Sequence, residues 1–141
     1  MTKITKVKTG NAFEDKESYS RLVRIGDWML MSNTAGRHPE TKVMPEDAAG
    51  QAEQVFDNME RLLTKIGSSL ADVVRSRVTI PNPADVPAVM EVVARRYKGI
   101  DPASTVLCSP LGLPHLKVEM EITAYFGAAG MEQERLVVPL V

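Results

Sequence analysis

Six short segments of the chain have strand-like patterns of apolar and polar residues. Gly26 and Asp27 separate the second segment from the third, so these two are predicted to form a hairpin. The segments are residues 4–8, 19–26, 28–36, 72–80, 104–109 and 116–126.

Two longer segments repeat apolar residues at the spacing of a helix. The first helix is predicted to begin near Pro45–Asp47, because proline and acidic residues favour a helix start, and to end at Gly67. The second opens at Pro83 and ends at Gly99. The order β-β-β-α-β-α-β-β predicts an α+β domain: a mixed six-stranded sheet with both helices on one face.

Residue parity divides the last strand into two unlike faces. Val118, Met120, Ile122 and Ala124 share the face that the helices should cover. Charged and polar residues share the other face, and so do Arg75, Arg77 and Thr79 of strand 72–80, while Val74 is expected beneath the helices. The segment WMLM (28–31) is apolar on both faces, so it needs cover on both sides of the sheet. A mixed polar and apolar sheet face indicates a homo-oligomer with its site near a subunit boundary.

Composition narrows the class of protein. The 141 residues predict one domain over 1–130, followed by an apolar C-terminal tail at 131–141 that is expected to pack on its own or a neighbouring subunit. A net charge of −1 and 5% aromatic residues argue against a nucleic-acid partner. One cysteine, no secretory pattern at the N-terminus and no long apolar run predict a cytoplasmic protein without a membrane partner.

Several segments together resemble the Rid (YjgF-like, reactive intermediate deaminase) family. They are YSRLVRIGDWMLMSNTAG, QAEQVFDNMERLLTKIGSSLADVVRSRVTI, the DPAS turn and LPHLKVEMEITA, which together cover about residues 19–126. The resemblance implies a chorismate-mutase-like (bacillar type) fold and a homotrimer whose sheets form a central barrel with clefts between neighbouring subunits. It also implies hydrolysis of enamine and imine intermediates without cofactor or metal.

One departure from the family pattern concerns the substrate. The family's deaminases carry Pro-Ala-Arg, whose arginine binds the substrate carboxylate, where this chain has Pro102-Ala103-Ser104. The family's Ser-Gly-Gln is Ser32-Asn33-Thr34 here, and a frequent helix asparagine is Met90. Tyr19, Ser32, Asn58 and Glu119 match the family, and Glu119 takes the position that orients or activates the attacking water.

The resemblance and the residue pattern therefore give a candidate site. Glu119 is the catalytic candidate, and the substrate-binding candidates are Tyr19, Ser32, Asn33, Thr34, Ser104, Thr105 and Arg77. We hypothesise that Arg75 or Arg77 supplies the positive charge that Ser104 lacks. The alternative is that Glu119 and Glu121 only pair with these arginines across strands. The serine and threonine hydroxyls could line a neutral pocket, or could simply be polar residues at strand ends.

Cys108 and His115 are weaker candidates. A cysteine nucleophile needs a contacting histidine and an orienting group, and their spacing supplies neither, so Cys108 is expected to pack in the core. His38, His115 and the scattered acids do not form a metal signature.

Three functions remain open. The first is a small-molecule hydrolase of the enamine and imine deaminase type with altered substrate specificity. The second is a non-catalytic, metabolite-binding or regulatory trimer, which the absent arginine favours. The third, an endoribonuclease, is disfavoured by a net charge near zero, because phosphate binding needs basic clusters.

Overall fold

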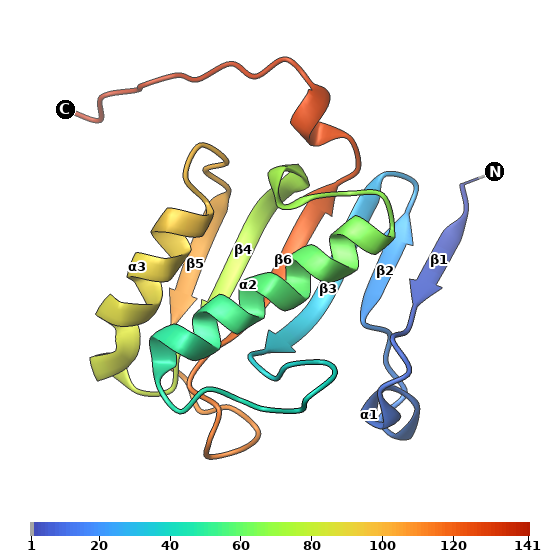
Figure 1. Ribbon diagram of the computed structural model, residues 1–141. Coiled ribbons are helices and arrows are strands. Elements are labelled where there is room, and N and C mark those ends of the chain that lie inside the picture. The colour runs from blue at the N-terminus through green and yellow to red at the C-terminus, as the bar shows by residue number, and fades with distance from the viewer. Residues whose placement is uncertain (1) are drawn as a thin grey trace.

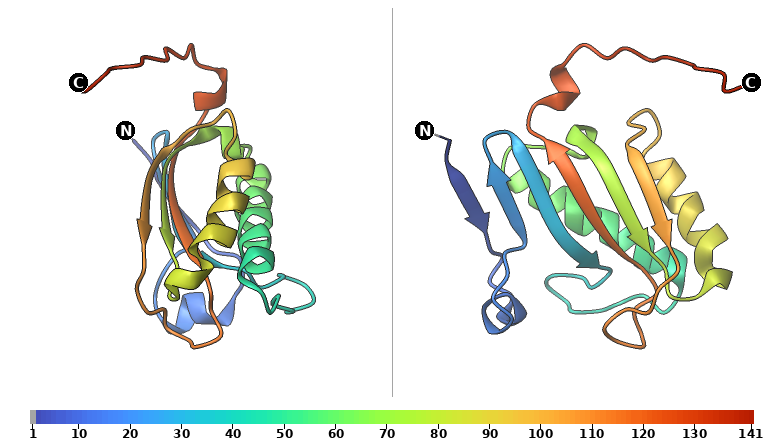
Figure 2. Two further views of the ribbon diagram at one scale, coloured as in Figure 1. Left: turned by 90° about the vertical axis from the view of Figure 1, so that its left-hand side faces the viewer. Right: turned by 180° about the vertical axis from the view of Figure 1, so that it is seen from behind.

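The computed structural model describes residues 2–141 as a six-stranded mixed sheet with two long helices on one face (Figures 1 and 2). The strand order is β1-β2-β3-β6-β4-β5, in which only the β4–β5 pair is parallel. The strands are β1 Ile4–Val7, β2 Leu22–Ile25, β3 Trp28–Ala35, β4 Val73–Thr79, β5 Ala103–Leu107 and β6 Glu119–Tyr125. The predicted order of elements and the α+β class are confirmed.

The two long helices begin and end where their sequence signals place them. In α2, Ala48–Lys65, the Asp47 carboxylate accepts a hydrogen bond from the Gly50 N–H at 2.8 Å, and Gly67 adopts a φ of 81° just beyond the end. A short 3-10 turn at Pro83–Asp85 leads into α3, Val86–Arg96. The caps satisfy backbone groups that a helix end leaves without partners.

The core lies between these helices and the sheet. The helix α2 contributes four fully buried side chains, Val55, Phe56, Met59 and Leu63. They pack in the same core as Met120 of β6 and Val118, just before that strand, which are also fully buried. Met29 and Met31 of β3 join this core, while Trp28 and Leu30 point to the other face and remain about half exposed. Figure 2 shows both long helices on one side of the sheet, so the WMLM strand is covered on one face only by residues 2–141.

Two local features differ from the sequence prediction. The segment expected as a polar connection contains a short helix, α1 at Ala12–Lys16, capped by Asn11. The register of β4 against β6 shifts between Val73 and Arg75, so Val73 enters the core and Val74 is exposed. A bulge adds one residue to a strand and reverses the facing of those beyond it, so the expectation that Val74 lies beneath the helices was wrong.

The tail leaves the sheet at the far end of β6. After the 3-10 turn Ala128–Gly130 it crosses towards the β5 side of the domain, where the chain ends (Figure 1). The Arg135 guanidinium binds the Asp101 carboxylate and the Gly99 carbonyl, the latter at 2.8 Å. The apolar residues of 136–141 are all exposed, so within this chain the tail is held through its arginine and not through its apolar side chains.

Candidate functional site

Glu119 opens β6 on the sheet face opposite the long helices. It lies beside Ala35 of β3 and Thr79 of β4. Asn33 donates a hydrogen bond from Nδ2 to Glu119 Oε2 at 3.1 Å. The carboxylate is half-buried and held in one orientation by a neighbouring strand.

A β-bulge explains how Asn33 reaches Glu119. The register of β3 against β6 shifts between Met31 and Thr34, which both have core-facing partners on β6. Strict alternation would send Asn33 to the helix face, and the extra residue turns it to the open face instead. The Ser32 hydroxyl does not contact Glu119; it donates a hydrogen bond to the Ser20 carbonyl at 2.8 Å. Thr34 is buried.

Arg21 connects the other candidates, and sequence reasoning missed it. Its Nη2 donates to the Tyr19 hydroxyl at 3.0 Å and its Nη1 to the Asn33 carbonyl at 2.7 Å. The guanidinium thereby fixes both a family-matching side chain and the residue that holds Glu119. The signal available in the sequence was its position two residues after Tyr19, which places both on one face of an extended strand.

Arg21 is itself anchored by a buried carboxylate from α1. Glu14 has no exposed surface, lies 3.3 Å from Arg21 Nε, and accepts hydrogen bonds from the Thr9 backbone and hydroxyl, both at 2.7 Å. Burial opposes the ionisation of Glu14, but the hydrogen bonds from Thr9 and Arg21 outweigh it and lower the pKa of this carboxyl. The short helix α1, which the sequence did not predict, therefore stabilises the candidate site by holding Arg21 in place.

The environment of Glu119 shifts its pKa in the opposite direction to that of Glu14. Burial raises the pKa of Glu119, and the charge of Arg21 and the hydrogen bond from Asn33 offset only part of that increase. A carboxyl group with a raised pKa is a better proton acceptor than an ordinary surface glutamate, so the position suits general acid–base chemistry.

The arginines of β4 form a second cluster. Arg77 lies 3.5 Å from Glu121, and Arg75 donates to the Thr105 hydroxyl at 3.4 Å. Both border a hollow of about 140 Å³ on the open face, with Leu30 opposite. Glu121 therefore fits the alternative in which a glutamate of this strand only pairs with an arginine of the neighbouring strand. Glu119 instead accepts a hydrogen bond from Asn33 and forms no salt bridge within residues 2–141.

Ser104 lies apart from Glu119 in the single chain. It belongs to the edge strand β5 and is adjacent to Ser76 of β4, which separates β5 from β6. Two strand spacings amount to about 10 Å. One chain thus brings together Tyr19, Asn33 and Glu119, and holds Ser104 and Thr105 at another edge.

The remaining candidates do not form a site. Cys108 is exposed, so the expectation that it packs in the core was wrong: β5 ends at Leu107, and the cysteine falls in the loop beyond it. His38 Nδ1 accepts two backbone hydrogen bonds within its own turn, at 3.2 Å each. Over residues 2–141 no group of three or more His, Cys, Asp or Glu side chains is arranged to hold a metal ion.

Comparison with known proteins identifies the family. The family model described as Endoribonuclease L-PSP matches residues 9–126. The chain belongs to this family, which is also the Rid (YjgF-like) family. The expectation drawn from the sequence motifs is confirmed.

Named relatives include deaminases. The chain is 32% identical over 108 residues to Reactive Intermediate Deaminase A, chloroplastic, of Arabidopsis thaliana, a match that covers 75% of this chain and 57% of the plant protein. It is 30% identical over 105 residues to a 2-iminobutanoate/2-iminopropanoate deaminase of Dermatophagoides farinae, covering 73% of this chain and 81% of the relative.

Solved structures of Rid-family proteins share the fold. A member of the YjgF/YER057c/UK114 family from Mycobacterium tuberculosis superposes with a TM-score of 0.78 at 33% identity, covering 87% of this chain and 99% of that one. RidA from an Antarctic Psychrobacter gives a TM-score of 0.74 at 28% identity, covering 86% and 94%. The chorismate-mutase-like fold is thereby confirmed. None of the helices in residues 2–141 has the length and apolar character needed to cross a bilayer.

Proposed function

We propose that this Rid-family chain is a cofactor-free hydrolase that converts an imine, or the imine form of an enamine, to a carbonyl compound and ammonia. The observation that carries the proposal is the half-buried Glu119 carboxylate, with its raised pKa and its hydrogen bond to Asn33. The two deaminase-named relatives support the reaction class.

The reaction divides into addition of water and loss of ammonia. In the first half Glu119 accepts a proton from water as the water oxygen attacks the C=N carbon, and returns that proton to nitrogen, which gives a neutral tetrahedral carbinolamine. In the second half the carboxylate takes the proton of the new hydroxyl and passes it to the amino nitrogen, the C–N bond breaks, and ammonia leaves as the carbonyl forms. Water and imine are the only reactants, so no electrons are exchanged with a cofactor.

The substrate is proposed to differ from the small 2-imino acids. Ser104 cannot form the planar two-pronged contact that an arginine makes with a carboxylate. Arg77, the candidate replacement, already faces Glu121 at 3.5 Å. A clear check is Arg77→Ala, which abolishes carboxylate-ligand binding if Arg77 has taken over this role and leaves affinity unchanged if it has not.

The proposal places the complete binding site at subunit boundaries of a homotrimer. Tyr19, Ser32 and Asn33 would form one wall of each cleft, and Ser104 and Thr105 of a neighbouring chain the other. Thr34, which is buried beside the core residue Met120, is not part of that wall. The separation of Ser104 from Glu119 by a whole strand within one chain supports this arrangement. A cytoplasmic location remains a prediction, since relatives include proteins named chloroplastic and mitochondrial.

The decisive experiment compares two glutamates of one strand. Unstable imines are generated in situ by an amino-acid or amine oxidase, and the ammonia released with and without the protein is followed. Glu119→Gln should remove the acceleration, by a factor of about 100 or more. Glu121→Gln alters the same strand and the same face, and should retain most of it. Equal activity of Glu119→Gln and the unsubstituted protein rejects the mechanism.

The second candidate is a non-catalytic metabolite-binding trimer, which Ser104 favours. Thermal-shift screening with keto acids and related metabolites, run beside the turnover assay, separates the two. Stabilisation without turnover by any generated imine supports the binding protein. An endoribonuclease, the activity in the family description, stays the least favoured reading because the net charge is −1.

A further inference from the structure

Glu119 is a half-buried carboxylate that pairs with no cation among residues 2–141. Its hydrogen-bond partner is the Asn33 amide, which is neutral. Glu121, two residues further along the same face of β6, lies 3.5 Å from Arg77. Charged groups withdrawn from water are normally paired with an opposite charge. Of the two carboxylates on β6, Glu119 is therefore the one that remains open to a cationic ligand.

Arg21 is the cation whose charge reaches Glu119, and Glu14 neutralises that charge. The Glu14 carboxylate has no exposed surface and lies 3.3 Å from Arg21 Nε, and its lowered pKa keeps it ionised at neutral pH. The two side chains together therefore carry no net charge. The other guanidinium nitrogens donate to the Tyr19 hydroxyl and the Asn33 carbonyl, which are neutral acceptors. The Arg21–Glu14 pair thus orients the site without giving it a positive charge.

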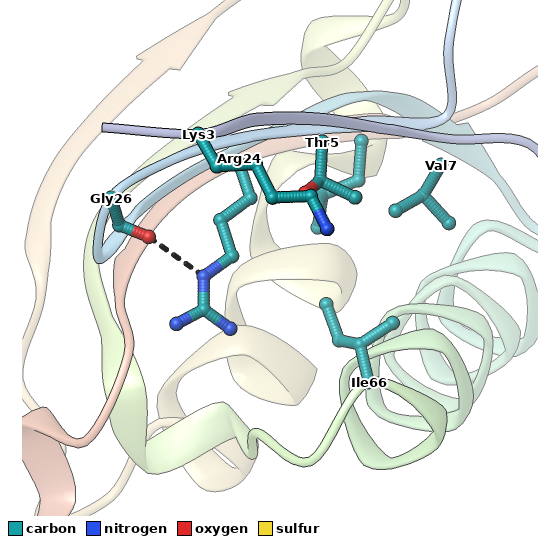
Figure 3. Close-up of a pocket in the computed structure, with 7 residues that line it drawn as sticks. Lys3, Thr5, Val7, Arg24, Gly26 and Ile66 are labelled. Atoms are coloured by element: carbon teal, nitrogen blue, oxygen red, sulfur yellow. Dashed lines mark hydrogen bonds between the residues drawn. The ribbon is translucent and has the colours of Figure 1, made fainter. Parts of the chain in front are cut away.

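Lys3 and Arg24 lie on the helix side of the sheet and not beside Glu119. They line a hollow of about 330 Å³ next to β1, β2 and the end of α2 (Figure 3). Figure 3 shows both side chains around the same space as Ile66, the C-terminal cap of α2. The Arg24 Nε also donates to the Gly26 carbonyl at 2.7 Å. Because the sheet separates these charges from the open face, they do not compensate Glu119.

The proposed opposite wall of the site lacks the family's carboxylate receptor. Ser104 stands where the family's deaminases carry the arginine that binds the substrate carboxylate. The serine and threonine hydroxyls of this wall are uncharged and can accept a hydrogen bond from an N–H group. Arg75 contacts the same wall, because its Nη2 donates to the Thr105 hydroxyl at 3.4 Å. Arg75 is therefore the rival receptor for a carboxylate, and the experiments below include it.

We propose that the substrate is a protonated imine without a carboxylate, of the kind formed when an amine is oxidised, and that its iminium N–H donates to the Glu119 carboxylate. This inference rests on the proposed hydrolase function and names its substrate class. Opposite charges favour each other's ionised forms, so the bound cation keeps Glu119 ionised and able to act as a base. An anionic 2-imino acid would instead bring a second carboxylate to an uncompensated one, and the two like charges would repel each other.

The iminium nitrogen already carries its proton when water adds. Glu119 takes a proton from water as the oxygen bonds to the C=N carbon and the π electrons move to nitrogen, which gives a neutral carbinolamine and a protonated carboxyl. The carboxyl gives that proton to the amino nitrogen, and then takes the hydroxyl proton as the C–N bond breaks. This last proton leaves with ammonia as ammonium. Iminium and water thus give a carbonyl compound and ammonium, with no change of oxidation state.

Stable analogues of three different charges test this preference. Propionamidine is a cation with a planar C=N group, propionamide is its neutral counterpart, and propionate is the anion of the same carbon skeleton. Each is titrated into the intact chain at about pH 8 and constant ionic strength, and binding is followed by calorimetry or NMR. Propionamidine should bind roughly tenfold more tightly than propionamide, and propionate most weakly. Glu119→Gln should remove the preference for the cation, and Glu121→Gln should keep it. Propionate binding tighter than propionamidine, or a cation preference that survives Glu119→Gln, overturns the proposal.

A matched pair of substrates separates this inference from the proposed function. Leucine with an amino-acid oxidase gives a 2-imino acid, and isoamylamine with a flavin amine oxidase gives the imine of the same side chain without the carboxylate. The acceleration of ammonia release over buffer alone, expressed as kcat/KM, should be roughly tenfold greater for the amine-derived imine. An equal or higher value for the leucine-derived imine overturns the inference and leaves the hydrolase intact, and its loss in Arg75→Ala would identify Arg75 as the carboxylate receptor. Acceleration of neither imine rejects the proposed function, and the order of the three analogues then decides the charge of the ligand by itself.

Discussion

Asn33 tunes the proton affinity of Glu119. Its hydrogen bond favours the ionised carboxylate and so lowers the pKa of Glu119 against the larger effect of burial. Asn33→Ala removes that bond, and the pKa of Glu119 rises further. Because the proposed base works only when ionised, the acid limb of the kcat/KM profile should move to higher pH.

This shift is measured by recording ammonia release from about pH 5 to 9 for both proteins. Glu121→Gln serves as the control, since Glu121 faces Arg77 and not Asn33. Its acid limb should coincide with that of the unsubstituted protein. An Asn33→Ala profile that only falls in height, with its limb unmoved, would mean that Asn33 positions substrate and does not tune the base.

Glu14 makes the fold sensitive to acid. Its pKa is below the usual 4.5 in the folded state, so the unfolded chain takes up this proton at a higher pH than the folded chain does. The stabilisation is therefore complete above about pH 5 and is lost as pH falls through the lowered folded-state pKa. Asp72, whose pKa is also lowered from 3.8, adds to the same trend.

Glu14→Gln should remove part of this dependence. At pH 7 the change leaves the mostly buried Arg21 side chain without its counter-ion, so the free energy of unfolding should fall by about 3 kcal/mol. Denaturant unfolding at pH 7 and pH 4 measures it, with Glu17→Gln at an exposed neighbouring position as the control, expected within about 0.5 kcal/mol. Equal pH slopes for Glu14→Gln and the unsubstituted protein would contradict the assignment.

Individual contacts were harder to predict than residue types. The motif match singled out Tyr19 and Glu119, but Arg21 was missed because its role depends on α1 folding back to supply Glu14. Cys108 was misplaced because strand pattern does not fix where an edge strand ends. Contacts made by loops depend on three-dimensional proximity, which apolar periodicity does not encode.

At the scale of the element, the helices were the most predictable part. In α2 the Asp47 cap and the apolar face indicate the same helix, and in α3 the proline-led turn before it and the apolar face do so; such agreement between local signals specifies structure well. The bulges in β3 and β4 were not predictable, because each adds one residue without any composition signal. Asn33 reaches Glu119 only through the first of them, so this part of the site could not be derived from strict alternation.

Arg96 fastens α3 to α2. From α3 its guanidinium contacts the carboxylates of Glu53, Asp57 and Glu60 at 2.8, 3.1 and 3.2 Å. Its side chain is mostly buried, and three acceptors on one planar donor outperform an isolated surface pair. Arg96→Met should lower the free energy of unfolding by about 1.5–3 kcal/mol.

Urea unfolding measures this loss, with Arg61→Met as the control. Arg61 lies 3.6 Å from Glu40 and is more exposed, so its removal should cost less than about 0.5 kcal/mol. The Arg96→Met effect should also shrink at 1 M salt, which screens such pairs. A loss no larger than that of Arg61→Met would mean that the four-residue cluster stabilises the fold no more than an exposed ion pair does.

For the whole molecule, the two sheet faces have different roles. The helix face holds the core, and the open face carries Trp28 and Leu30 beside the charged residues of β4 and β6. Half-exposed apolar side chains amid fixed charges fit a contact between copies of the chain. The resemblance to the Rid family supplied the trimer hypothesis, and the uncovered face is the physical feature of this chain that supports it.

Leu30→Asp tests whether this face is the interface. Leu30 is 48% exposed, and in a lone chain an aspartate there would be tolerated. In a trimer barrel it would place three carboxylates together in a water-poor centre, which ionised groups resist. Light scattering after size exclusion should therefore give three chain masses for the unsubstituted protein and one for Leu30→Asp. Val43→Asp, at a loop position that is 63% exposed, should keep three. Three chain masses for Leu30→Asp would move the interface away from the open face, and the Glu119 cluster would then have to work within a single chain.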